Sequence, residues 1–141
     1  TYLMRNSRYR YSRLVMIIGS IVFAISAGAL LVDPFAFVSY IGLPSNESVV
    51  WSFRLTGVLL VALAAHMATT SRNAGDPAFR RAALVMILVS IGLAVLTYLA
   101  PGTATTGRWV FVGIGAGFAA LYMITLPIKS IGYKEEQPHS A

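Results

Sequence analysis

The stretch LVMIIGSIVFAISAGALLV, residues Leu14–Val32, decides the fold, because it is apolar, uncharged and long enough to cross a membrane. Three further stretches have the same character: Val49–Thr70, Ala82–Ala100 and Trp109–Pro127. An α-helix needs about 20 residues to cross a hydrocarbon core about 30 Å thick, so each stretch predicts a transmembrane helix. The sequence therefore predicts an all-α protein, a polytopic membrane four-helix bundle forming a single transmembrane domain over residues 1–141.

Charged side chains are scarce within these stretches, which argues against a soluble bundle. Apart from tyrosines, only Arg54 and His66 bring a titratable group into these stretches, and Asp33 directly follows the first of them. A soluble helix needs a polar stripe facing water, and these segments lack one. With 57% hydrophobic and 11% charged residues, the chain also leaves no room for a separate soluble domain. The absence of cysteine excludes disulfides, thiolate metal sites and iron–sulfur ligation.

The net charge of +6 is arranged by side of the membrane rather than gathered on one surface. Arginines and lysines cluster before the first stretch, in the middle loop and after the last stretch: Arg5, Arg8, Arg10, Arg13, Arg72, Arg80, Arg81, Lys129 and Lys134. By the positive-inside rule both termini are cytoplasmic, including a polar cytoplasmic tail at residues 129–141. We expect a multi-pass protein of a bacterial cytoplasmic (inner) membrane, with the lipid bilayer and not nucleic acid as its partner.

The two halves of the chain resemble each other. The segments Leu14–Ile21 and Leu84–Ile91 are identical at six of eight positions. The second and fourth stretches both begin with the pattern Trp-x-Phe-x-x-x-Gly, as Trp51-Ser52-Phe53 with Gly57 and as Trp109-Val110-Phe111 with Gly115. Because corresponding helices enter from the same side, we interpret the chain as two tandem helical hairpins related as a parallel repeat, with chance similarity as the alternative.

The loop over residues 33–48 is aromatic and apolar, yet too short to span a membrane. We expect it to lie in the outer membrane interface, where aromatic rings favour headgroup depth, or to be covered by a partner protein. The same reasoning assigns five aromatic side chains as interface anchors: Trp51, Trp109, Phe35, Phe37 and Tyr40.

Arg54 is the most conspicuous charged residue, because an arginine inside a membrane helix costs free energy unless it has a partner or reaches the interface. Asp33 ends the first stretch and would lie at a similar depth in an antiparallel hairpin. A structural ion pair between Arg54 and Asp33 is therefore favoured. The alternatives are an anionic ligand held by Arg54 and a side chain that extends to the headgroups.

His66 is the one histidine within the stretches and a candidate ligand for a haem or another pigment. A haem with two histidine ligands is not expected within one chain, since the other histidine, His139, lies in the tail. A hydrogen bond to a neighbouring helix or to the headgroups is the simpler interpretation, so the sequence predicts no bound cofactor.

Small residues recur on the last stretch with the spacing of close helix packing: Gly113, Ala116, Gly117 and Ala120. The neighbouring helix is either internal or part of another protein. No set of catalytic residues and no cluster of metal ligands accompanies them, so the sequence predicts neither an enzyme nor a metal site.

An arginine-rich start, a first helix ending at Asp33-Pro34, an aromatic first loop and Arg54 followed by Gly57 resemble the small four-helix bacterial inner-membrane proteins of the DoxX-like group. The resemblance covers nearly the whole chain. It implies a membrane protein of a class that includes accessory subunits of terminal oxidase or thiosulfate-oxidising complexes, and it assigns no catalytic residue.

The first functional hypothesis is a non-catalytic accessory or structural subunit of a larger membrane protein complex, of the electron-transport or monooxygenase type, that packs through its small residues. The first alternative is a small homo-oligomeric transporter or ligand-binding protein that recognises an anion through Arg54. The second alternative is a subunit that holds a pigment or haem through His66.

Overall fold

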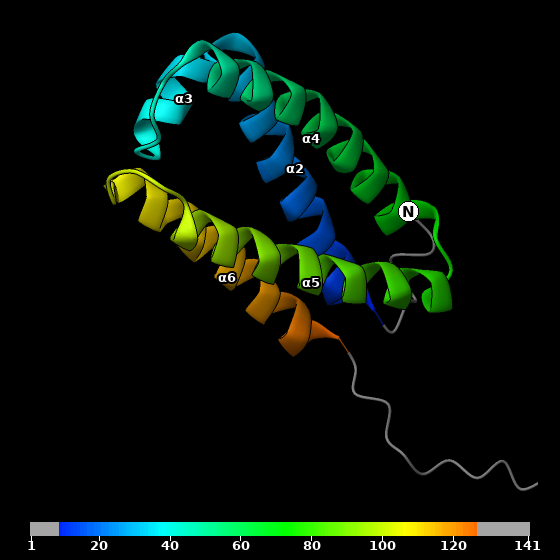
Figure 1. Cartoon of the computed structure of the whole chain (residues 1–141). Helices are drawn as coiled ribbons and strands as arrows, with labels where there is room; N and C mark the ends of the chain where they lie inside the picture. Colours follow the sequence, from blue (N-terminus) through cyan, green and yellow to red (C-terminus); the bar gives the residue numbers. More distant parts are fainter. Residues whose placement is uncertain (1–8, 127–141) are drawn as a thin grey trace, which may run out of the picture.

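The computed structural model describes residues 9–126, and the expectations for Arg5, Arg8 and the tail at 129–141 lie outside these residues. The described chain consists of helices without a strand, as predicted. Four long helices, α2, α4, α5 and α6, are joined in a bundle with one short helix, α3 (Figure 1). Their bounds are Arg10–Val32 for α2, Pro34–Tyr40 for α3, Glu47–Asn73 for α4, Asp76–Leu99 for α5 and Thr106–Thr125 for α6.

Each of the four long helices is long and apolar enough to cross a membrane. The helices begin earlier than the apolar stretches because polar residues form their first turns. The Asn46 side chain accepts a hydrogen bond from the backbone N–H of Val49 and so caps α4, and Pro77 lies in the first turn of α5. Hydropathy detects the apolar centre of a helix but not such polar ends.

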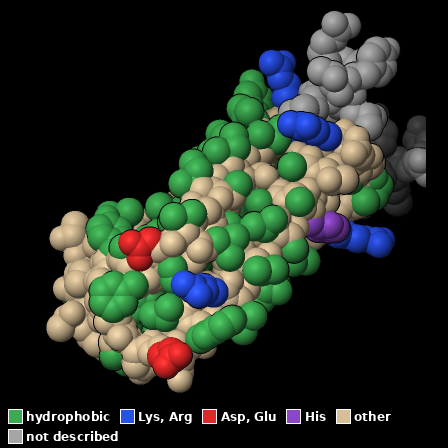
Figure 2. All heavy atoms as spheres, turned by 90° about the horizontal axis from the view of Figure 1, so that it is seen from above, with side chains coloured by type: hydrophobic (Ala, Val, Ile, Leu, Met, Phe, Trp, Pro, Cys, Tyr) green, Lys and Arg blue, Asp and Glu red, His purple; other side chains and the backbone are tan. Residues whose placement is uncertain are grey.

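The surface agrees with spans that face lipid. On the face shown in Figure 2, hydrophobic side chains extend along the molecule, while charged side chains lie toward its two ends. Many of the largest exposed side chains are aliphatic, for example Ile25, Leu59 and Leu88. Exposed aliphatic surface on every long helix is what a bilayer requires, and it would be costly in water.

The long helices pair as two hairpins. Helix α2 packs along α4 and α5 packs along α6, whereas α2 and α6 touch less and α4 and α5 touch little (Figure 1). We call the end that holds α3 and the α5–α6 loop the α3 end, and the opposite end, near Arg10, Ala74 and Thr125, the terminal end. The hairpins are therefore two closely packed units joined mainly at their ends.

The residues of the repeated pattern occupy matching environments in the two hairpins. Trp51 and Trp109 are both exposed, at 57% and 54%. Gly57 lies close against Leu30 and Leu31 of α2, and Gly115 lies equally close against Ala94 of α5. Each glycine thus lets the two helices of its own hairpin approach, which gives the repeat a common physical role.

The loop predicted at residues 33–48 contains a short helix. Pro34–Tyr40 form the helix α3, and the carboxylate of Asp33 caps it by accepting a hydrogen bond of 2.9 Å from the backbone N–H of Ala36. An aspartate followed by proline is a strong helix-start signal, because the side chain satisfies a free N–H and proline needs none.

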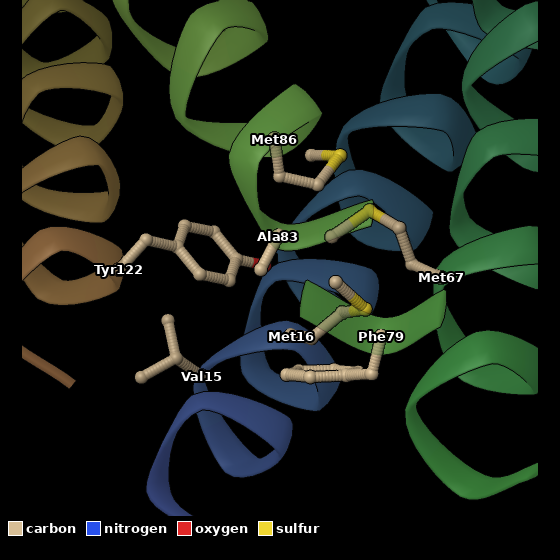
Figure 3. Close-up of a cluster of buried hydrophobic side chains, with 7 residues drawn as sticks. All are labelled: Val15, Met16, Met67, Phe79, Ala83, Met86 and Tyr122. Carbon is tan, nitrogen blue, oxygen red and sulfur yellow. The ribbon is translucent and has the colours of Figure 1, made fainter. Parts of the chain in front are cut away.

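A buried cluster joins the hairpins at the terminal end (Figure 3). Its members come from all four long helices: Val15, Met16, Met67, Phe79, Ala83, Met86 and Tyr122. We call these seven residues the methionine cluster, because three flexible methionines accompany Tyr122, whose hydroxyl has no hydrogen-bond partner among the described residues. Met16 and Met86, which correspond in the repeat, both lie in this core.

Beside this cluster, Arg13 is completely buried and anchors the α4–α5 turn. Its guanidinium donates hydrogen bonds to the carbonyls of Ser71 at 2.9 Å and Ala74 at 2.7 Å, and to the carboxylate of Asp76 at 3.0 Å. The guanidinium also lies 4.5 Å from the ring centre of Phe79. Ser71 and Ala74 supply carbonyls from the C-terminal end of α4, so a cation here is favoured by the helix dipole.

Replacing Arg13 with alanine should therefore destabilise the protein strongly. We expect Arg13→Ala to lower the free energy of unfolding by about 3 kcal/mol, because it leaves buried carbonyls without donors. The measurement is unfolding in mixed micelles followed by circular dichroism. Arg72→Ala, an exposed change in the last turn of α4, is the matched control and should cost less than about 0.5 kcal/mol. Equal effects of the two changes would contradict the anchoring role.

Candidate ligand cavity between the hairpins

A cavity of about 290 Å³ lies between the two hairpins, on the α3 side of the methionine cluster. All five helices contribute to its wall, which is almost entirely apolar. Typical lining residues are Leu30 and Phe53 from the first hairpin and Leu93 and Ile114 from the second. Because Leu93 and Leu96 line the cavity and are also exposed at the surface, the cavity opens toward the surroundings of the bundle.

Aromatic rings close the cavity at the α3 end. The ring of Phe37 on α3 lies 5.1 Å from that of Phe111 on α6 and 6.0 Å from that of Phe53 on α4. Phe53 and Phe111 are the two phenylalanines of the repeated pattern, so Phe37 bridges equivalent positions of the hairpins. Tilted ring pairs at these distances add about 1 kcal/mol each beyond the area they bury.

Hydrogen bonds also join the two loops at the α3 end, which are residues 41–46 and 100–105. Three successive carbonyls, those of Tyr40, Ile41 and Gly42, accept bonds from Thr105 Oγ1, Arg108 Nε and Thr103 N at 2.6, 3.1 and 3.1 Å. We call this set the loop contact. Gly42 and Gly102 have φ angles of 76° and 94°, which only glycine adopts easily, and they allow the two backbones to meet.

Arg108 is the charged residue of the cavity wall. Only 5% of it is exposed, and its guanidinium donates to the carbonyls of Ile41 at 3.1 Å, Ala100 at 2.7 Å and Pro101 at 2.8 Å. These carbonyls end α3 and α5, so Arg108 caps helix C-termini as Arg13 does. It has no carboxylate partner among the described residues, in which the one salt bridge is Arg13–Asp76.

The predicted ion pair between Arg54 and Asp33 does not form. Asp33 instead caps α3, and the guanidinium of Arg54 lies on the exposed surface of α4, 6.0 Å from the ring centre of Trp51. A similar depth in the hairpin does not produce an ion pair here, because the Asp33 carboxylate already accepts a hydrogen bond at the N-terminus of α3. Exposed placement near the α3 end fits the alternative in which the Arg54 side chain extends to the headgroups.

His66 lies exposed on α4, away from the lining of the cavity. The described residues contain no group of three or more histidine, aspartate or glutamate side chains that could hold a metal. The cofactor role of His66 stays a prediction.

The small residues of α6 face outward. Gly113, Ala116, Gly117 and Ala120 are all exposed, and a side chain added at either glycine would meet no other atom within 4 Å. Of the two packing partners considered, an internal helix is therefore excluded for this face in the described chain. Gly115, between the two glycines, is the residue that packs against α5.

The expected interface anchors fall into two groups. Trp51, Trp109, Phe35 and Tyr40 are exposed at the α3 end, where a membrane interface could receive them. Phe37 differs from the expectation, since its half-buried ring packs inward between the hairpins. A helix of seven residues has two faces, and composition alone does not tell which aromatic side chain points inward.

Sequence reasoning missed the buried roles of Arg13 and Arg108, since Arg13 was treated only as a marker of membrane side and Arg108 was given no role. One signal was present: both lie in the first turn of a helix, where the dipole disfavours a cation. A buried arginine at such a position has to find carbonyls elsewhere, and the ends of neighbouring helices supply them. The Pro101-Gly102 turn near Arg108 was a further sign of free carbonyls.

The close approach of α6 to α3 generates a test. A side chain at Gly107 would collide with the Tyr40 carbonyl and ring, so Gly107→Ala should break the loop contact and cost about 2 kcal/mol of unfolding free energy. Gly92→Ala in α5 is the matched control, since its new methyl group meets nothing within 4 Å and should stabilise the helix by up to about 1 kcal/mol. Unfolding in mixed micelles measures both, and a neutral Gly107→Ala would refute the contact.

Comparison of this chain with protein-family models, with curated proteins and with solved structures gave no significant match. The resemblance to the DoxX-like group therefore stays a prediction from the sequence.

Proposed function

We propose that this protein is a non-catalytic membrane protein that binds a lipophilic small molecule between its two hairpins. The supporting observation is the cavity of about 290 Å³, close to the smaller end of the roughly 300–1,000 Å³ usual for small-molecule sites. Its wall is apolar with one buried cation, Arg108. An apolar wall with a few placed polar groups is the usual composition of such sites.

Access to the cavity favours a molecule dissolved in the membrane. The opening near Leu93 and Leu96 lies among side chains that face the surroundings of the helices, while the loop contact closes the α3 end. A ligand would enter from the side, between α4 and α5, where the hairpins have few contacts. This proposal replaces Arg54 of the sequence-based alternative with Arg108, because Arg54 does not line the cavity.

Blocking the cavity tests the proposal. Leu93→Trp places a large ring in the wall, and the amount of small molecule that is extracted with the protein from native membranes should fall roughly tenfold. Leu88→Trp, on the same helix and 71% exposed, does not line the cavity and should leave the bound molecule unchanged. The readout is mass spectrometry of the intact protein and of its extract. No co-extracted molecule, or equal amounts in both variants, would reject the proposal.

A second function has its own support. The outward face formed by Gly113, Ala116, Gly117 and Ala120 is what a close helix–helix contact in a membrane needs. It favours the role of an accessory or structural subunit that packs against a larger membrane complex, or against further copies of itself. Both termini on the cytoplasmic side of a bacterial inner membrane remain part of this proposal.

Bulky residues on this face should prevent assembly. We expect the double variant Gly113→Leu with Gly117→Leu to lose the partner subunits or the self-association seen after gentle extraction, because the leucines would keep the helices apart. Gly92→Leu, at another glycine with open space around it, is the control that should keep the assembly. Size-exclusion chromatography with mass spectrometry of the eluted subunits gives the answer. A wild-type protein that runs alone as a monomer would reject this role.

A further inference from the structure

The two ends of the cavity differ in polarity, because the buried guanidinium of Arg108 lies at one of them. Its lining on α6 extends from Arg108 at the α3 end to Phe118, about 15 Å at 1.5 Å per residue. The remaining polar lining groups are uncharged serine and threonine hydroxyls: Ser26, Thr56, Ser90 and Thr97. A bound molecule would therefore meet a cation at one end and apolar side chains along most of its length.

Arg108 has hydrogen-bonding capacity that the protein does not use. An arginine carries five N–H donors, and Arg108 makes three hydrogen bonds, all to backbone carbonyls. Two N–H groups of a side chain that is 95% buried thus have no acceptor among the described residues. Both belong to the terminal nitrogens, each of which already donates one hydrogen bond, and an acceptor brought by a ligand would satisfy them.

The charge of Arg108 also lacks a full counter-charge. The three carbonyls offer partial negative charge from two helix ends, but no aspartate or glutamate belongs to the cavity wall. A carboxylate would supply both the negative charge and acceptor oxygens that suit the planar guanidinium. An amine would be repelled by the same residue.

The size of the cavity limits the rest of the molecule. A cavity of about 290 Å³ lies at the small end of the range usual for small-molecule sites, which favours a ligand with one hydrocarbon chain over a ligand with two. On the basis of the function proposed above, we propose that the cavity binds a single-chain amphiphilic carboxylic acid, with its head at Arg108 and its chain directed toward Phe118.

The test uses the full chain in nanodiscs of phosphatidylcholine and three probes of equal chain length: dodecanoate, methyl dodecanoate and dodecylammonium. Displacement of radiolabelled dodecanoate by each probe is measured. We expect dodecanoate to bind roughly ten- to hundredfold more tightly than the ester, the usual gain from hydrogen bonds to a charged group, and dodecylammonium to bind least.

The probe comparison separates this inference from the proposed function. Equal binding of all three probes would overturn the carboxylate assignment and leave a lipophilic site. Binding of none would reject the site itself. Displacement of dodecanoate by phosphatidylglycerol added to the discs would assign the cavity to a two-chain membrane lipid, and would overturn the single-chain assignment.

Variants give an independent check. Arg108→Gln should remove the preference for dodecanoate over its methyl ester, while Leu93→Trp should weaken both probes together. Arg54→Gln removes an exposed arginine that does not line the cavity and should preserve the preference. Since Arg108 also holds the loop contact, circular dichroism must show that Arg108→Gln is folded; if it is not, the comparison of probes on the wild-type protein decides. A folded Arg108→Gln that still prefers the acid would overturn the inference.

Discussion

Arg13 and Arg108 each hold a guanidinium against the carbonyl oxygens at the C-terminal ends of neighbouring helices. Such carbonyls have no partner within their own helix and cannot be left without donors in a buried position. An arginine is suited to them because its donors form a fixed fork and its charge matches the negative end of the helix dipole. The connections between helices at both ends of the bundle depend on this one interaction.

The cavity exists because the two hairpins contact each other mainly at their ends. Within each hairpin a glycine, Gly57 or Gly115, draws the two helices together, whereas α4 and α5 of different hairpins scarcely touch. The hairpins are joined by Arg13 and the methionine cluster at one end, and by Arg108 and the Phe37 ring at the other. Between these two groups of contacts the hairpins stay apart, and the space between them is the cavity.

The sequence predicted the helices well because membrane insertion depends on a sum over about 20 residues, which tolerates errors at single positions. It predicted side-chain roles less well because a role depends on which face of the helix a residue occupies. Arg54 attracted attention as a charge within an apolar stretch, yet it lies on the surface. Arg108 lies at a helix end, where charge is ordinary, yet it is buried. Asp33 was assigned to the wrong partner because its place as a helix cap was overlooked.

Helix α6 links the two surfaces to which we assign functions. Successive residues of an α-helix are about 100° apart, so Gly115 lies about 160° from both Gly113 and Gly117 around the helix axis. Gly115 lines the cavity, whereas Gly113 and Gly117 face outward. A ligand in the cavity and a protein at the outer face would therefore contact opposite sides of one helix and would not exclude each other. The same α6 helix can thus pack a partner and enclose a ligand, which makes the two proposed functions compatible within one molecule.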